Sequence, residues 1–144
     1  MTKDLDRRLD TARLVSRLVE LPGLIGEVSR QLTALRAERR ALERRAAEAW
    51  ARALAEAPGK AMELREAQAR LALAADPGWN RMQTRLEQLA AAIDRLQAER
   101  EALEHERKAI YGAIVARHAE VLEAALAQRF ITPHGLPPAP GRGN

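Results

Sequence analysis

With 144 residues, the chain has room for one domain, and its composition favours long helices. Apolar residues make up 47% of it but aromatic residues only 3%, so the large, varied side chains that fill a globular core are scarce. The absence of cysteine excludes disulfides and thiolate metal sites. A net charge of +4 lends little support to nucleic-acid binding, because 24 basic residues face 20 acidic ones.

No segment has the run of about 18 apolar residues that a membrane-spanning helix needs. The N-terminal sequence mixes acidic and basic residues and lacks the apolar core of a signal peptide. These features predict a cytoplasmic protein without a membrane partner.

Proline and glycine divide the chain into four predicted helices. The breaks fall at Pro22-Gly23, at Pro58-Gly59 and at Asp76-Pro77, where Asp76 suits a helix N-cap and Pro77 a first helical position. Prolines and glycines also crowd the C-terminal end, which predicts disorder there. We therefore expect one helical domain over residues 1–131 and a disordered tail over 132–144. The predicted helices cover about residues 4–20, 23–57, 60–75 and 77–129.

The last predicted helix carries a heptad seam, in which large apolar residues recur three and four positions apart on one face. Only Arg100, Arg107 and Arg117 interrupt this seam. A helix of this length, on the order of 75–80 Å at 1.5 Å per residue, cannot cover its own apolar face and needs a partner. The seam consists of Trp79, Met82, Leu86, Leu89, Ile93, Leu96, Leu103, Ile110, Ile114 and Val121.

A matching seam precedes Pro58 and predicts an all-α fold, a long antiparallel coiled-coil helical hairpin with one broken arm. We expect the chain to reverse at Asp76-Pro77 and the first arm to be broken at Pro58-Gly59. The predicted apolar pairs are Val28 with Val121, Leu35 with Ile114, Ala46 with Leu103, Ala53 with Leu96, Leu64 with Leu86 and Leu71 with Trp79. The predicted charged pairs are Arg45 with Glu106 and Arg52 with Glu99.

Two alternatives keep the same seams. The helices could pair between chains, or the helix at 60–75 could fold back onto the helix before it. A two-helix hairpin buries only one stripe of each helix, and the segment with Leu5, Leu9 and Val15 still needs cover. We therefore expect a homo-oligomer, with a dimer favoured.

Polar residues show no catalytic or metal-binding pattern. His105 and His118 form no metal-binding motif, and no serine or threonine has a neighbouring base to activate it. Glycine-rich phosphate-binding loops are also missing from the sequence. The sequence predicts no catalytic residue, no metal site, no cofactor and no enzymatic activity.

Two groups of residues are candidates for binding. Arg36, Arg40, Arg44 and Arg45 form a basic stripe that could contact nucleic-acid phosphates, although glutamates are interleaved with it and no aromatic residue lies in it to stack a base. The second group could set helix register or the choice of a protein partner, because seam arginines disfavour wrong pairings and flanking aromatics anchor interfaces. This group consists of Arg39, Arg100, Arg107, Arg117, Trp50 and Tyr111.

Residues 59–82 resemble a motif of small phage and prophage coiled-coil proteins, in which G-K-N-x-x-x-R-x-A-Q precedes D-x-x-Y and a long charged helix. The matching residues are Gly59, Lys60, Arg65, Ala67, Gln68, Asp76 and Trp79, with Ala61 in place of the asparagine and Trp79 in place of the tyrosine. The resemblance implies an accessory of phage replication and recombination. In shape alone, the predicted hairpin is similar to the Gam family of phage nuclease inhibitors, which bind DNA ends.

The sequence therefore favours a non-catalytic coiled-coil protein that acts through protein–protein association, in the manner of a phage accessory protein. One alternative is a DNA-binding accessory factor that uses the basic stripe. Another is a stalk or adaptor coiled coil.

Overall fold

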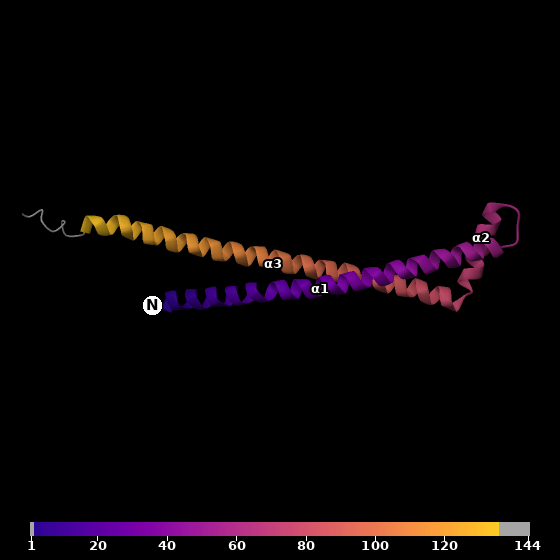
Figure 1. The fold of residues 1–144 in the computed structure, drawn as a ribbon, viewed down its shortest axis with the longest axis horizontal. Helices are drawn as coiled ribbons and strands as arrows, with labels where there is room; N and C mark the ends of the chain where they lie inside the picture. Colours follow the sequence, from indigo (N-terminus) through magenta and orange to yellow (C-terminus); the bar gives the residue numbers. More distant parts are fainter. Residues whose placement is uncertain (1, 136–144) are drawn as a thin grey trace, which may run out of the picture. The chain divides into compact units, whose positions relative to one another are not determined.

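The computed structural model describes residues 2–135, which form three α-helices and no strand. Helix α1 spans Thr2–Glu56, α2 spans Met62–Ala74 and α3 spans Pro77–Gly135 (Figure 1). The predicted all-α helical hairpin is confirmed. The chain divides into two compact units. Unit 1 contains the described residues up to Pro22 and from Glu104 onward, and unit 2 contains Gly23–Leu103.

The core of unit 2 lies between α1 and α3. Val28 and Leu32 from α1 pack with Ile93 and Leu96 from α3, and all four side chains are buried. Full burial of such a side chain stabilises the fold by about 1.5–3 kcal/mol. Partly buried residues extend this core on both helices, namely Leu35 and Leu103. The two seams predicted from the sequence therefore do face each other.

The chain reverses between α1 and α2. Helix α1 ends at Glu56, and Gly59 adopts a φ of 142°, a conformation that glycine tolerates far better than other residues. Helix α2 then packs against the last turns of α1, where Arg65 donates a hydrogen bond to the Leu54 carbonyl oxygen, and Ala69 and Leu73 are buried. Figure 1 shows this loop and α2 crossing the end of α1 toward the start of α3. The turn of the hairpin is thus at residues 57–61.

A second break separates α2 from α3. Asp76 caps α3 as predicted, since its Oδ1 accepts a hydrogen bond from the Gly78 N–H at 2.9 Å and its carbonyl oxygen accepts one from the Asn80 N–H at 3.1 Å. The Asn80 side chain also donates to the Ala74 carbonyl oxygen at 3.1 Å. This cap begins a new helix within the second arm of the hairpin.

The two break points therefore have the opposite roles from those predicted. We expected a reversal at Asp76-Pro77 and a broken first arm, but the chain reverses at Pro58-Gly59 and the second arm is broken. The alternative in which residues 60–75 fold back onto the preceding helix is the one observed. Both breaks stop a helix, and the positive φ of Gly59 is what permits the reversal.

This change also shifts the helix register. Glu106 pairs with Arg17 and not with Arg45, and Leu35 packs on the Ile93 and Leu96 cluster and not on Ile114. The predicted partners of Leu64 and Leu71 are wrong as well, since both side chains are exposed. Heptad seams repeat about every 3.5 residues, so sliding one helix by several turns still places apolar residues opposite each other. The position of the turn selects among these registers.

Helix α1 continues through Pro22, where we expected a break. Proline cannot donate a main-chain hydrogen bond and usually kinks or ends a helix. In unit 1, Leu21 is fully buried, and in unit 2, Val28 is buried, so tertiary packing holds the helix on either side of the proline. The short separate helix predicted at 4–20 is therefore part of α1.

The end of α3 also differs from the prediction. The helix extends to Gly135, beyond the expected end at 129, so residues 132–135 of the predicted tail belong to α3. The remainder of the predicted disordered tail lies outside the described residues. None of the three described helices has both the length and the apolar character needed to cross a bilayer.

Candidate interaction surfaces

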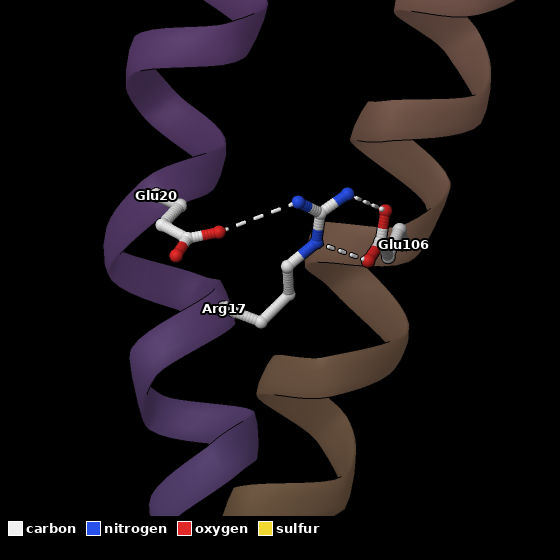
Figure 2. A network of polar contacts seen from close by, with 3 residues as sticks. All are labelled: Arg17, Glu20 and Glu106. Carbon is white, nitrogen blue, oxygen red and sulfur yellow. Dashed lines mark hydrogen bonds and ion pairs between the residues drawn. The ribbon is translucent and has the colours of Figure 1, made fainter.

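Unit 1 is held on one side by an ion pair between α1 and α3. Arg17 donates from Nε to Glu106 Oε1 at 2.6 Å and from Nη2 to Oε2 at 3.1 Å, and a third bond reaches Glu20 at 3.4 Å (Figure 2). The hydrogen bonds from Arg17 lower the pKa of Glu106, and those to Glu106 raise the pKa of Arg17. A two-pronged contact of this kind fixes orientation as well as distance.

The opposite side of unit 1 is apolar and exposed. At 100° per residue, the exposed apolar residues of α1 are centred about 160° around the helix from Arg17, and those of α3 about 170° around the helix from Glu106. Because the helices run antiparallel, both stripes face the same side of the pair. The exposed fractions reach 74% at Val19 and 62% at Tyr111. We call this surface the outer apolar face, formed by Leu5, Val15, Val19, Tyr111, Val115, Leu122 and Leu126.

A cavity of about 590 Å³ lies between α1 and α3 within unit 1, and basic side chains dominate its polar lining. Arg117 donates from Nη1 to Thr11 Oγ1 at 2.8 Å in a partly buried contact, which fixes the position of the guanidinium group. Ile114, Val121 and Ala124 supply apolar walls, and Glu120 is the acidic residue in the lining. We call this cavity the cationic pocket, with Arg7, Arg8, Arg117 and His118 as its basic residues.

Helix α2 also has an exposed apolar stripe. Leu64 and Leu71 are seven residues apart, which places them on one line of the helix, and they are 51% and 73% exposed. They lie on the side away from the buried Ala69 and Leu73. The charges around them balance, because Glu63 and Glu66 match Arg65 and Arg70. We refer to Leu64 and Leu71 as the α2 stripe.

The predicted basic stripe lies on α1 in unit 2. Arg36, Arg40, Arg44 and Arg45 are exposed and, within the part of the chain that is described, form no ion pair. The interleaved acids are occupied elsewhere. Glu38 accepts hydrogen bonds from Arg85 at 2.8 and 3.0 Å, which lower the pKa of Glu38. Glu43 accepts a bond from Arg39 at 2.9 Å.

The four predicted seam arginines do not share one environment. Arg39 and Arg107 are exposed and so lie outside the buried seam, because the observed register differs from the predicted one. Arg100 and Arg117 are partly buried, and both make polar contacts within the chain.

The two candidate aromatic residues lie in different units. Trp50 is partly buried in unit 2, whereas Tyr111 belongs to the outer apolar face of unit 1. The predicted specificity residues are therefore divided between the two units.

The cationic pocket was not predicted from the sequence. His118 was considered only as a metal ligand. The arginines near the N-terminus lie among acidic residues, so the net charge of that segment gives no sign of a basic site. A signal was nevertheless available, because Arg7 and Thr11 lie one turn apart on α1 and Arg117 and Val121 lie one turn apart on α3. Only the correct register brings these two segments together.

Among the described residues, no three histidine, aspartate or glutamate side chains gather in an arrangement that could hold a metal ion. Comparison of the chain with protein-family models, curated protein sequences and solved structures found no match. The surfaces described above are therefore the basis for assigning a function.

Proposed function

We propose that this protein is a non-catalytic helical hairpin that acts through protein–protein association and forms a homodimer through the α2 stripe. The exposure of Leu71, 73% on a helix whose other side is buried, is the observation that supports this most directly. Large apolar side chains ordered along one line of a helix are typical of a surface that another helix covers.

The charges on α2 favour a second copy of the same chain as the partner. A two-fold axis brings identical surfaces together, so a surface with unbalanced charge repels its own copy. Helix α2 carries two glutamates and two arginines. In an antiparallel pair of α2 helices, Leu64 of one chain lies opposite Leu71 of the other, and the axis passes close to Ala67.

Light scattering on the 144-residue chain tests this proposal. We expect a mass of about twice 16.0 kDa for the wild type and the mass of one chain for Leu71→Asp. The matched control is Leu24→Asp, which places the same charge at another exposed leucine of unit 2 and should leave the dimer intact. A monomeric wild type, or a Leu71→Asp variant that stays dimeric, would contradict homodimerisation through α2.

The basic stripe supports a second candidate function, binding to DNA as an accessory of phage replication or recombination. Two of the interleaved glutamates are neutralised by other arginines, so the four exposed guanidinium groups remain available to phosphates. The resemblance of residues 59–82 to phage proteins agrees with this role.

A mobility-shift series with single- and double-stranded DNA tests this second candidate. Phosphate contacts release counterions, so binding should weaken steeply with salt and should fail in a variant with Arg36, Arg40, Arg44 and Arg45 changed to Gln. Absence of binding at about 50 mM salt, or binding that salt does not change, excludes the candidate.

A further inference from the structure

The outer apolar face and the cationic pocket adjoin each other in unit 1. Arg8 and His118 line the pocket and, by their helical positions, also lie on the lines of the two apolar stripes. Lys108 falls on the α3 stripe as well, between Glu104 and Tyr111. A ligand lying on the apolar stripes would therefore meet the basic groups of the pocket.

The charge of this region is strongly unbalanced, in contrast to α2. Three guanidinium groups and one imidazole line the pocket together with one carboxylate, that of Glu120. Glu104, at the far end of the α3 stripe, already takes part in a contact within the chain. A second copy of the same face would bring further cations to this region, so a partner with acidic side chains fits it better.

We propose that unit 1 binds an acidic amphipathic helix of another protein. Its apolar side packs on the outer apolar face, and one of its carboxylates enters the cationic pocket. Arg117 is the main contact, because its bond to Thr11 uses one N–H group and leaves others to bind a carboxylate in a two-pronged manner. This inference rests on the proposed role in protein–protein association and names the partner's chemistry.

Selection from a display library of random 16-residue peptides on the immobilised 144-residue chain tests the inference. We expect enriched peptides to carry aspartate or glutamate together with apolar residues three and four positions apart. The best peptide is then synthesised and its binding measured by fluorescence anisotropy. Arg117→Gln and Val115→Asp should each weaken binding by about tenfold or more, because one removes a charged hydrogen-bond donor and the other places a charge on the apolar face.

The matched control replaces two exposed arginines of unit 2 that belong to none of the surfaces described above, Arg81→Gln with Arg95→Gln, and should bind the peptide like the wild type. Enrichment of neutral or basic peptides, or binding that Arg117→Gln does not change, would overturn the inference. If Val115→Asp loses the mass of the dimer, a second copy of the chain occupies the outer apolar face and the inference is wrong. Displacement of the peptide by single-stranded DNA would also overturn it.

The same assay separates this inference from the dimer proposal. Leu71→Asp is expected to be monomeric and still to bind the peptide. The two proposals can therefore fail separately. Dimerisation through α2 can fail while unit 1 still binds the peptide, and peptide binding can fail while the dimer persists.

Discussion

Arg65 of α2 donates a hydrogen bond from Nη2 to the main-chain carbonyl oxygen of Leu54, 2.9 Å away in the last turn of α1. The last carbonyl groups of a helix have no partner within the helix, and a cation near them also favours the helix dipole. Arg65 therefore closes the end of α1 and holds α2 against it. Arg65 Nε and Gln68 Oε1 are buried beside this contact without a hydrogen-bond partner among the described residues.

Arg65→Ala should destabilise the protein by about 1–3 kcal/mol, because it removes a charged donor from a partly buried carbonyl group. The measurement is the free energy of unfolding in urea. Arg70→Ala is the control. Arg70 is exposed, and its ion pair with Glu66 is weak, because its Nη2 lies 4.0 Å from Glu66 Oε2. If the two substitutions lower the free energy of unfolding equally, the contact between Arg65 and Leu54 does not hold α2 against α1.

Gly59→Ala should also destabilise the protein, by about 1–3 kcal/mol, because alanine is strained at positive φ. An added Cβ would in addition approach the Leu64 side chain at 3.2 Å. Gly23→Ala is the matched control. It lies inside α1 with open space around an added Cβ, so it should stabilise by about 0.5–1 kcal/mol. Thermal unfolding followed by circular dichroism distinguishes the two variants. If Gly59→Ala unfolds at the same temperature as the wild type, the chain does not reverse at this residue.

Acid should weaken unit 1 through Glu106. Its pKa is lowered by the hydrogen bonds from Arg17, so the folded state favours the ionised carboxylate more than the unfolded state does. The resulting stability is present above the ordinary glutamate pKa of about 4.3 and is lost as the pH falls through the lower pKa of the folded state. Glu106→Gln should be less stable than the wild type at neutral pH, and this difference should shrink in acid.

Melting temperatures of the two proteins between about pH 7 and pH 2 check this, since that interval includes the titration range of carboxylates. Glu101→Gln, at an exposed position on α3, serves as the control for changing a surface carboxylate. A constant difference between wild type and Glu106→Gln across the pH range would contradict the assignment.

The observed register predicts which positions can be cross-linked. Glu38 and Arg85 are in direct contact across unit 2, so cysteines at both positions should be joined within one chain by a short bifunctional reagent. The absence of natural cysteine makes such pairs unambiguous. Cysteines at Ala46 and Leu103, which the sequence had paired, should not be joined within a dilute monomer. Efficient linking of the second pair would restore the register predicted from the sequence.

The sequence predicts the helices and their buried sides well, because both depend on local spacing. The seam positions Leu89, Ile93, Leu96 and Ile110 are buried as expected, although Val121 is 65% exposed. The cap at Asp76 was also predictable, since it depends on two adjacent residues.

The turn and the register could not be predicted with the same success. Pro58-Gly59 and Asp76-Pro77 both interrupt a helix, and only the tertiary packing of Ala69 and Leu73 shows which of them reverses the chain. Every pairing across the hairpin follows from that choice. The cationic pocket depends on it too, because it joins residues from both ends of the sequence.

Homodimerisation through α2 is the central claim, and a single cysteine tests it most directly. In the antiparallel α2 pair, Ala67 lies near the two-fold axis, so Ala67→Cys should form a disulfide-linked dimer under mild oxidation. The control is Ala91→Cys on α3, which is also exposed but lies away from α2. We predict rapid linking at position 67, its loss when Leu71→Asp is added, and slow linking at position 91. If cysteine at 67 stays monomeric, or links no faster than at 91, the proposed dimer is wrong.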